Sequence, residues 1–317
     1  MMYLGIDVGS VSTDIVVLDE KLNVMHKLYL RTKGRPIKAV QEGLYELSKY
    51  YKDSDIKAVG TTGSGRYLTK VLVGADIAKN EITAHAIAAI NLDREVRTII
   101  EIGGQDSKII TIENGVVTDF AMNTVCAAGT GSFLDRQAER LEIPIEKFGE
   151  YALKSKNPVR IAGRCAVFAE SDMIHKQQLG YDVSDIIAGL CNALARNFIS
   201  NVAKGKDIKP KIFFQGGVAA NIGMKKAFEE ILNMEIYVPE HHDVMGAIGA
   251  AILAKEQIED IGKTSFRGFR IYDMSVKPNT FKCNGCSNMC EIVELKENDI
   301  NIGYFGDKCG RWSRVAV

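Results

Sequence analysis

The sequence has no net charge and no long apolar run. Its 317 residues hold 40 Lys+Arg and 40 Asp+Glu, so its formal charge gives no overall attraction to nucleic acid or to an acidic membrane surface. The longest uninterrupted apolar stretch covers residues 244–254, which is too short to span a bilayer. The first ten residues also lack the basic and then apolar region of an export signal. We therefore expect a cytoplasmic protein that binds neither nucleic acid nor membrane.

What the sequence does have is enough apolar residues for a sizeable core, and an uneven set of cysteines. With 46% hydrophobic and 25% charged residues, the composition is typical of a globular protein, and the length exceeds that of a usual single domain. Seven cysteines without an export signal argue against a disulfide framework, because cytosolic thiols stay reduced. Cys126, Cys165 and Cys191 lie mid-chain, and the other four fall within residues 283–309. This distribution favours metal or redox chemistry.

The hydrophobic pattern repeats along the chain. Apolar and β-branched runs predict three strands joined by tight turns near the N-terminus, and the same arrangement returns near residue 98. The strands are expected over residues 3–8, 13–18, 24–30, 56–61, 98–102, 108–113, 116–122 and 211–215, and the helices over 36–51, 81–92, 131–141, 166–179, 183–203 and 219–233. Two halves built alike indicate an internal duplication. After residue 261 the helical periodicity weakens, so we expect a small cysteine-rich appendage there rather than more of the core.

Three glycine-rich turns carry the most specific chemistry. Residues 7–13 (DVGSVST) join the first two strands, residues 102–107 (IGGQDS) take the same place in the second half, and residues 216–221 (GGVAAN) link a strand to a helix. Glycine lets backbone N–H groups approach phosphate oxygens, hydroxyls add donors, and an aspartate can hold hydrated Mg²⁺. At the third turn, the helix N-terminus favours anionic groups and the glycines admit a flat base. One such turn alone is more often an ordinary hairpin turn, but the three in this order are far more specific.

These turns resemble the phosphate-1, phosphate-2 and adenosine motifs of the actin/Hsp70/sugar-kinase ATPase superfamily. Residues 61–66 (TTGSGR) and 245–251 (MGAIGAA) resemble its two interdomain connecting loops. More narrowly, residues 123–133 (NTVCAAGTGSF) and 163–172 (GRCAVFAESD) resemble the activator ATPases of 2-hydroxyacyl-CoA dehydratases. Related members of that family, the BadF/BadG/BcrA/BcrD type, serve benzoyl-CoA reductases and double-cubane-cluster proteins.

The resemblance implies an α/β fold, namely a duplicated ribonuclease-H-like domain with a nucleotide cleft between its two halves. Residues 1–92, completed by a helix over 244–262, would form the first half. Residues 93–243 would form the second half and carry the cluster cysteines, and residues 263–317 would form the small cysteine-rich C-terminal module.

The resemblance also implies a site for ATP or ADP with Mg²⁺. Asp7 and Asp106 would organise the Mg²⁺ ion and its waters, and Gln105 or Asp106 would orient the attacking water. The remaining residues of the three turns would hold the nucleotide: Gly9, Ser10, Ser12, Thr13, Gly103 and Gly104 at the phosphates, and Gly216, Gly217, Asn221 and Lys225 at the nucleoside.

Family members are homodimers with one [4Fe–4S] cluster held between the subunits by two cysteines from each. The matching residues here are Cys126 and Cys165. A cubane cluster takes four thiolates, so two per chain require a second copy. Both cysteines precede predicted helices, whose free N–H groups and positive dipole ends favour thiolates. Cys191 lies in an apolar helical stretch and is expected in the core.

The implied activity is an ATPase coupled to electron transfer. A ferredoxin or flavodoxin would reduce the cluster, and ATP hydrolysis would drive one low-potential electron to a partner iron–sulfur enzyme in an anaerobic cytoplasm. That partner would be a 2-hydroxyacyl-CoA dehydratase or a double-cubane-cluster protein. The alternative on the same fold is a small-molecule kinase, which leaves Cys126 and Cys165 without a role. A chaperone-like module is a third reading, but it lacks a recognisable peptide-binding domain.

Two further groups of metal-binding residue types remain open. Cys283, Cys286, Cys290 and Cys309 have spacings that suit tetrahedral zinc or a second iron–sulfur cluster, and the alternative is reduced cysteines in a docking appendage. The adjacent histidines in residues 240–243 (EHHD) suggest a metal site. Neighbouring side chains on a loop point in different directions, however, so we expect a solvated polar loop there.

Overall fold

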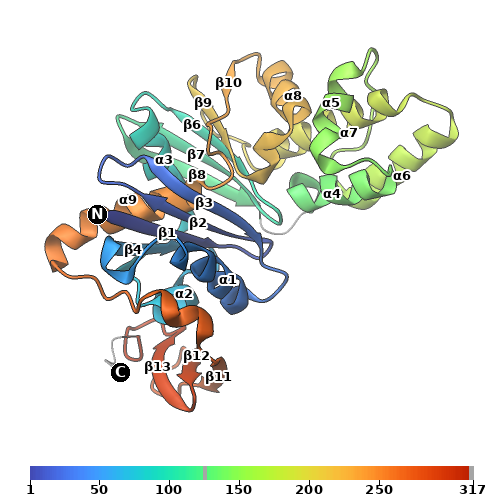
Figure 1. Ribbon diagram of the computed structural model, residues 1–317. Coiled ribbons are helices and arrows are strands. Elements are labelled where there is room, and N and C mark those ends of the chain that lie inside the picture. The colour runs from blue at the N-terminus through green and yellow to red at the C-terminus, as the bar shows by residue number, and fades with distance from the viewer. Residues whose placement is uncertain (124–126, 314–317) are drawn as a thin grey trace. The chain divides into compact units, whose positions relative to one another are not determined.

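The chain divides into two units, each built on a five-stranded sheet. The computed structural model describes residues 1–123 and 127–313 (Figure 1). Unit 1 comprises Met1–Ala88 and Gly246–Val317, and unit 2 comprises Ala89–Met245.

The sheet of unit 1 has the strand order β3-β2-β1-β4-β5. β1, β2 and β3 form an antiparallel meander, whereas β4 and β5 run parallel to β1. The strands are β1 (Met2–Val8), β2 (Ser12–Leu18), β3 (Val24–Arg31), β4 (Ile56–Thr62) and β5 (Ile77–Ala78). β1, β2 and β4 are almost wholly buried, but the edge strand β3 alternates between half-buried and exposed residues. The inner strands are therefore covered on both faces.

Helices cover the two faces of this sheet. They are α1 (Pro36–Ser48), α2 (Arg66–Val73), α3 (Glu81–Leu92) and α9 (Met245–Ile261), with a 3-10 turn at Asp53–Asp55. A Cβ atom on Gly43 of α1 would meet the Ile15 side chain, whereas one on Gly5 of β1 would lie 1.9 Å from the Ala247 carbonyl oxygen of α9. Ile15 pairs with Ile6 in the β1–β2 register, so it shares the face opposite to that of Gly5. α9 therefore lies directly on the face of β1 that also carries Asp7.

The sheet of unit 2 repeats the topology of unit 1. Its order is β10-β9-β6-β7-β8, with an antiparallel meander β6–β7–β8 and with β9 and β10 parallel to β6. The strands are β6 (Thr98–Ile102), β7 (Ser107–Glu113), β8 (Val116–Asn123), β9 (Ile212–Gln215) and β10 (Ile236–Tyr237). The duplicated α/β fold expected from the sequence is confirmed.

The helices of unit 2 pack around an aromatic core. They are α4 (Gly131–Arg140), α5 (Ile145–Lys154), α6 (Ala166–Gln178), α7 (Val183–Asn201) and α8 (Ile222–Leu232), with 3-10 turns at Ala127–Gly129 and Gly217–Ala220. The Phe228 ring lies 5.4 Å from the rings of both Phe198 and Phe214, in edge-on contact. None of the helices in the described ranges combines the length and apolar composition needed to cross a bilayer.

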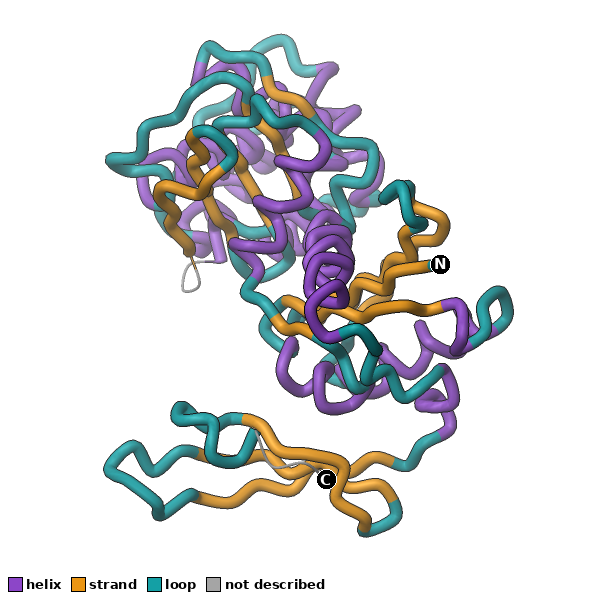
Figure 2. Tube along the Cα trace, turned by 90° about the vertical axis from the view of Figure 1, so that its left-hand side faces the viewer, coloured by secondary structure: helices purple, strands orange, loops and turns teal. Residues whose placement is uncertain are grey.

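The C-terminal segment folds as a three-stranded antiparallel sheet that packs on unit 1. After the 3-10 turn Phe269–Asp273 come β11 (Val276–Lys282), β12 (Glu291–Glu297) and β13 (Ile300–Phe305), all visible as strands in Figure 2. Phe269, Ile271, Leu295 and Ile302 are buried in the same hydrophobic cluster as the unit 1 core. The expected C-terminal appendage is present as these extra strands, and its apolar side chains also extend the unit 1 core.

Candidate functional site

The turn between β1 and β2 is a tight hairpin with an open tip. The Gly9 N–H donates to the Ser12 carbonyl oxygen at 2.9 Å, and Ser10 at the tip is exposed. The Ser12 hydroxyl donates to Asp14 Oδ2 at 3.2 Å. Gly9, Ser10 and Ser12, three of the residues expected at the phosphates, thus lie together in one turn.

Thr13, the fourth residue expected there, faces inward instead. It is fully buried, and its hydroxyl oxygen lies 3.0 Å from that of Thr32. The Thr32 hydroxyl donates its hydrogen to the Gly9 carbonyl oxygen at 3.1 Å. A hydroxyl has one hydrogen to donate, so Thr13 is the donor in its hydrogen bond with Thr32. The Thr13 hydroxyl therefore supports the turn from beneath rather than presenting a donor to a phosphate.

The carboxylate of Asp7, at the end of β1, lies between two glycines. A Cβ atom on Gly63 would come within 2.3 Å of Asp7 Oδ1, and one on Gly246 within 2.0 Å of Asp7 Oδ2. Gly63 follows β4, and Gly246 lies in the first turn of α9, so they belong to the two segments that resemble connecting loops. Only glycine leaves room for the carboxylate in this position. The two glycines of unit 1 thus leave the space that the Asp7 carboxylate occupies.

Polar groups surround this carboxylate on the protein side. Thr62, opposite Asp7 in the β1–β4 register, is fully buried, and its Oγ1 has no hydrogen-bond partner in the described part of the chain. The buried His85 places Nε2 within 3.3 Å of the Cβ position of Gly246. Because buried hydroxyls are ordinarily paired, the unpartnered Thr62 hydroxyl fits a bound water or ligand atom beside Asp7.

The corresponding turn of unit 2, between β6 and β7, is braced by a helix. The Gly103 N–H donates to the Asp106 carbonyl oxygen at 3.0 Å. From the start of α4, the Gly131 N–H donates to the Gly103 carbonyl oxygen, and the N–H and hydroxyl of Ser132 donate to that of Gly104. Gln105 is exposed at the tip. Gly103, Gly104, Gln105 and Asp106 are thereby held in one rigid turn.

Asp106 is fixed by a buried ion-pair group. Lys108 Nζ lies 2.7 Å from Glu101 Oε2 and 3.0 Å from Asp106 Oδ2. Lys108 and Glu101 are almost completely buried. Burial by itself would lower the pKa of Lys108, but the two carboxylates outweigh it and raise that pKa above its ordinary value. Lys108 therefore stays charged and ties Asp106 to the sheet.

The third glycine turn lies next to the second through Glu101. A Cβ atom on Gly216 would come within 2.7 Å of Glu101 Oε1, and one on Gly103 within 3.2 Å of the same oxygen. Gly216 has φ +88°, and its N–H donates to the His242 carbonyl oxygen at 2.8 Å. His242 Nδ1 also lies 3.0 Å from the Gly216 carbonyl oxygen. The expected solvated loop at residues 240–243 is therefore wrong for His242, which secures this turn.

Asn221 and Lys225, expected at the nucleoside, lie on the first turns of α8. Asn221 Oδ1 caps the helix by accepting the N–H groups of Gly223 and Met224. Its Nδ2 is buried with no hydrogen-bond partner in the described residues. Lys225 pairs with Glu229 at 3.3 Å and lines a pocket of about 380 Å³ together with His242. This volume falls within the range of small-molecule sites.

Cys165, one of the two expected cluster ligands, stands at the N-terminus of α6. It is half-buried, and its side chain makes no capping hydrogen bond. Val167 and Phe168 follow on the first turn, with 69% and 67% of their surface exposed. Cys126, the other expected ligand, lies outside the described residues.

The Glu170 carboxylate joins α6, which follows Cys165, to α4, which follows Cys126 in the sequence. Glu170 of α6 accepts from Arg136 at 3.1 Å and from Arg140 at 2.6 Å, both on α4. On the other side, Asp172 Oδ2 accepts from the Ala162 N–H at 2.8 Å. These contacts fix the backbone on both sides of Cys165.

The remaining cysteines fall into two environments. Cys191 is buried in α7, as expected, and burial raises its pKa to about 12. The tail cysteines are half-buried or exposed, and hydrogen bonds from the Trp312 indole and the Gly285 N–H lower the pKa of Cys283. Among the described residues, no three His, Cys, Asp or Glu side chains are grouped as metal ligands would be.

Sequence reasoning missed Glu101, Lys108 and His242. A signal existed for the first two: each is a charged residue inside a run that reads as a buried strand, and the hairpin register places them opposite each other. His242 carried no such signal, because its contact with Gly216 joins segments far apart in the sequence.

The chain resembles one family of ATPases over most of its length. The sequence model of the BadF/BadG/BcrA/BcrD ATPase family matches residues 4–254. The (R)-2-hydroxyglutaryl-CoA dehydratase activating ATPase of Acidaminococcus fermentans is 38% identical over 255 residues, which are 79% of this chain and 96% of that protein.

Solved structures agree with that similarity. The activator of the 2-hydroxyisocaproyl-CoA dehydratase from Clostridium difficile, with bound ADPNP, is 34% identical and superposes with a TM-score of 0.75 over 83% of this chain and 97% of its own. A ROK family glucokinase from Streptomyces griseus has a TM-score of 0.51 at 13% identity, over 81% of this chain and all of its own. The glucokinase shares the fold alone.

Proposed function

The chain belongs to the BadF/BadG/BcrA/BcrD ATPase family, and from that premise we propose that it is the ATP-dependent activator of a partner iron–sulfur enzyme. The partner would be a 2-hydroxyacyl-CoA dehydratase, a double-cubane-cluster protein or a related reductase. The relatives named as dehydratase activators favour this function over a small-molecule kinase.

The nucleotide part of this proposal rests on the glycine turns. The N–H groups of Gly9 and Gly103 close the two turns, and the backbone N–H groups of Ser10 and Gly104 beside them would receive the phosphates of ATP. Gly63 and Gly246 make room for the Asp7 carboxylate, and the unpartnered Thr62 hydroxyl next to it fits a water of a hydrated cation. Asp7 and Asp106 would therefore hold Mg²⁺ and its waters, and the ADPNP in the C. difficile relative supports a nucleotide in this family's fold.

Of the two residues proposed to orient the attacking water, we favour Gln105. Asp106 Oδ2 is engaged by Lys108 at 3.0 Å, whereas Gln105 is exposed at the tip of the same turn. An amide that donates and accepts can align a water without taking its proton. Gln105 is accordingly the better candidate, with Asp106 as the group that holds the turn.

Electron transfer is proposed to use Cys165 and Cys126. A thiolate at the N-terminus of α6 gains from the free N–H groups and the dipole of that helix, and Cys165 has no capping bond to give up. The first turn of α6 contains no acidic residue, so nothing on this turn opposes a negatively charged group. With two cysteines per chain, a [4Fe–4S] cluster would need a homodimer; when bound, it supplies one-electron transfer.

The exposed Val167 and Phe168 beside Cys165 fit such an interface between two copies of the chain. Large apolar side chains at high exposure commonly mark surfaces that a partner covers. The electron donor would be a ferredoxin or a flavodoxin, in an anaerobic cytoplasm.

The observation that carries this proposal is the position of Cys165 at a helix start within a chain of the ATPase family. Anaerobic purification of the full chain should give about four irons and four labile sulfides per dimer. The Cys165→Ser variant should lose both and shift toward monomer, while its ATP-binding residues remain. The Cys191→Ala variant is the matched control, because it removes a cysteine that is buried in the core.

Two results would contradict the proposal. A Cys165→Ser protein with full iron content would exclude this residue as a ligand. A wild-type monomer without iron or sulfide, prepared under strict exclusion of oxygen, would remove the electron-transfer role and leave the kinase alternative.

A further inference from the structure

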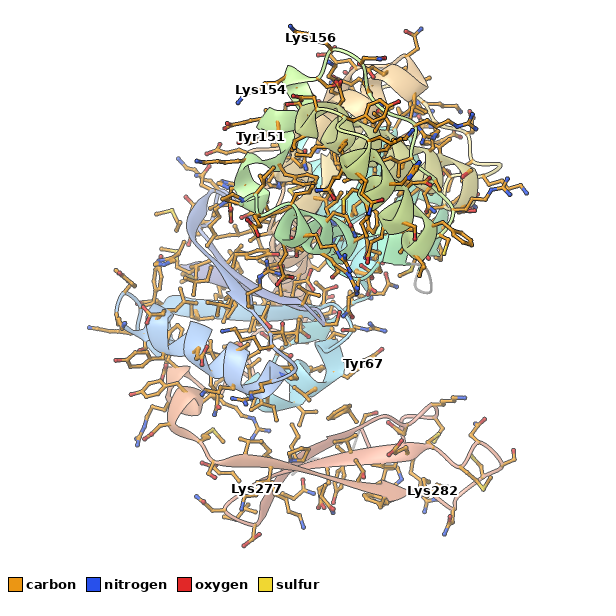
Figure 3. The ribbon with its side chains drawn as sticks, turned by 90° about the vertical axis from the view of Figure 1, so that its right-hand side faces the viewer. Tyr67, Tyr151, Lys154, Lys156, Lys277 and Lys282 are labelled. Atoms are coloured by element: carbon orange, nitrogen blue, oxygen red, sulfur yellow. The ribbon has the colours of Figure 1, made fainter. Side chains whose placement is uncertain are left out.

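One end of the C-terminal sheet brings two tail cysteines face to face. The β11–β12 register pairs Lys282 with Glu291, so the next residues outward, Cys283 and Cys290, stand opposite each other. The Cys283 N–H donates to the Cys290 carbonyl oxygen at 2.8 Å and closes the hairpin there. Lys282 marks this end of β11 in Figure 3, and Lys277 marks the other. Opposed residues have Cβ atoms about 4.5–5.5 Å apart, so both sulfurs can reach one small ion.

The hairpin loop supplies a third cysteine. The Gly285 N–H donates to Cys283 Sγ at 3.4 Å, and the Met289 N–H donates to the Cys286 carbonyl oxygen at 3.2 Å. Met289 adopts a left-handed backbone with φ 42°, which turns the chain back toward Cys290. The loop thus folds around the Cys283 sulfur, and an N–H bond to a ligand sulfur is a common second-layer contact of metal thiolates.

Cys309 lies on a segment anchored at both ends to this part of the sheet. A Cβ atom on Gly306 would come within 2.5 Å of the Glu291 carbonyl oxygen, next to Cys290. At the other end, the Trp312 indole N–H donates to Cys283 Sγ at 3.3 Å, and its ring lies 4.9 Å from the Phe281 ring. Cys309 is exposed between the two anchors.

We propose that Cys283, Cys286, Cys290 and Cys309 bind one Zn²⁺ ion. Zinc takes four thiolates in a tetrahedron with Zn–S bonds of about 2.3 Å, which places neighbouring sulfurs about 3.8 Å apart. An opposed cysteine pair meets that spacing, whereas an iron–sulfur cube spreads its thiolates over separate iron atoms.

Assembly of the site requires side-chain movement. The sulfurs are not grouped in the described structure, but Cys286 and Cys309 are exposed and can change rotamer at little cost. Zinc binding would complete the ligand set, as it does in other small metal sites. Lys282, Lys308 and Arg311 lie beside the cysteines in the sequence and offset the negative charge of four thiolates on one zinc ion.

This site goes beyond the proposed function and is independent of it. β13 packs on α2 of unit 1: a Cβ atom on Gly303 would meet the Val71 side chain, and the Arg267 guanidinium donates to the Ile302 carbonyl oxygen at 2.7 Å. By tying the hairpin to the segment after β13, zinc would stabilise the sheet that covers α2.

The test is zinc, iron and sulfide content of the full chain and of four single variants, all purified anaerobically without chelator. Wild type should hold about one zinc per chain, and Cys283→Ser and Cys309→Ser should each lose it. Cys191→Ala and Cys165→Ser should keep it. Titration of the metal-free wild type with Co²⁺ should give the intense sulfur-to-cobalt absorption of four-thiolate coordination, which needs no variant to fold.

Three outcomes would overturn the zinc site. The first is an absence of both zinc and cobalt–thiolate absorption. The second is iron and sulfide that survive in Cys165→Ser but disappear in Cys283→Ser, because the tail would then hold a cluster. The third is a disulfide between two of the four cysteines in freshly isolated protein. Iron lost from Cys165→Ser alone bears on the proposed electron transfer and leaves the zinc site standing.

Discussion

The first glycine turns of the two units occupy the same place in the same sheet topology, yet they fix their aspartates by different means. In unit 1, Gly63 and Gly246 leave just enough room for the Asp7 carboxylate. In unit 2, the buried Lys108 holds Asp106 through an ion pair that it shares with Glu101. Close packing against two glycines thus characterises the first carboxylate, and a buried ion pair characterises the second.

This difference has a consequence for what each aspartate can do. Asp7 lies at the end of β1 between two glycines and beside the buried Thr62 hydroxyl, and carboxylate oxygens are ligands that Mg²⁺ prefers. Asp106 already shares a buried ammonium group, so part of its charge is compensated. We therefore propose the main metal contact at Asp7 of unit 1, with the turn of unit 2 held by Lys108.

The largest effect is expected from Lys108→Met. Removal of the ammonium leaves Glu101 buried without its cation, which costs about 3–5 kcal/mol of folding free energy. Urea unfolding followed by circular dichroism would measure this loss. The double variant Glu101→Gln with Lys108→Met should recover most of it, because no unpaired charge remains buried. A single variant within about 1 kcal/mol of wild type would show that the ion pair does not hold the turn.

The ion pair between Lys108 and Glu101 also determines how the free energy of unfolding changes with pH. The pKa of Lys108 is raised in the folded protein above its value of 10.5 in the unfolded chain. Its contribution is therefore complete below pH 10.5 and decreases as the pH rises further. Stability of wild type relative to the double variant should be constant between about pH 7 and 9 and fall above about pH 10.5. A decline that begins near neutral pH would point to another group.

Asp7→Asn should affect activity more than stability. The carboxamide fits the same space but carries no charge for a metal ion, so ATP hydrolysis should fall by roughly a hundredfold. Iron content should be unchanged, because Asp7 and the proposed cluster cysteines belong to different units. The exposed Asp273→Asn is the matched control. Unchanged hydrolysis in Asp7→Asn would place the metal contact elsewhere.

Much of this organisation could be predicted from the sequence, because hydrophobic periodicity and glycine turns are local signals. The two strand meanders, α1, α3, α7 and the turns at Gly9 and Gly103 follow from such patterns. The expected elements do not include α2 and α5. The tail strands were missed because only β12 and β13 bury residues of their inner face, and the signal in each is weak.

Sequence patterns point to residue types for the candidate site but not to the contacts that those residues make. Sequence patterns identify Asp7, Asp106 and Cys165, since each sits in a recognisable turn or helix start. They do not show that Thr13 faces Thr32, nor that His242 bonds Gly216, because both contacts depend on how distant segments pack.

The surroundings of Asp7 and Asp106 predict different losses of ATP hydrolysis when a neighbouring glycine is replaced by alanine. Gly246→Ala places Cβ 2.0 Å from Asp7 Oδ2, whereas Gly103→Ala places it 3.0 Å from Asp106 Oδ1. The first must displace the carboxylate and should lower ATP hydrolysis about tenfold, since small misplacements at a reacting centre are costly. The second needs only a slight adjustment and should lower it less than about threefold. Equal losses in the two variants would remove the distinction between the turns.

The smallest effect is expected at Thr13, where the hydroxyl supports the turn of unit 1 from inside. Thr13→Val keeps the shape but removes the donor to Thr32, so it should lower stability by about 1 kcal/mol and leave the KM for ATP nearly unchanged. Ser12→Ala should show the opposite pattern, because its hydroxyl lies on the half-exposed side of the turn. Thermal unfolding and steady-state ATPase measurements on both variants separate the two roles. A Thr13→Val protein with wild-type stability and a raised KM would mean that this hydroxyl reaches a phosphate after all, and the turn of unit 1 would then open further in solution than its hydrogen bonds indicate.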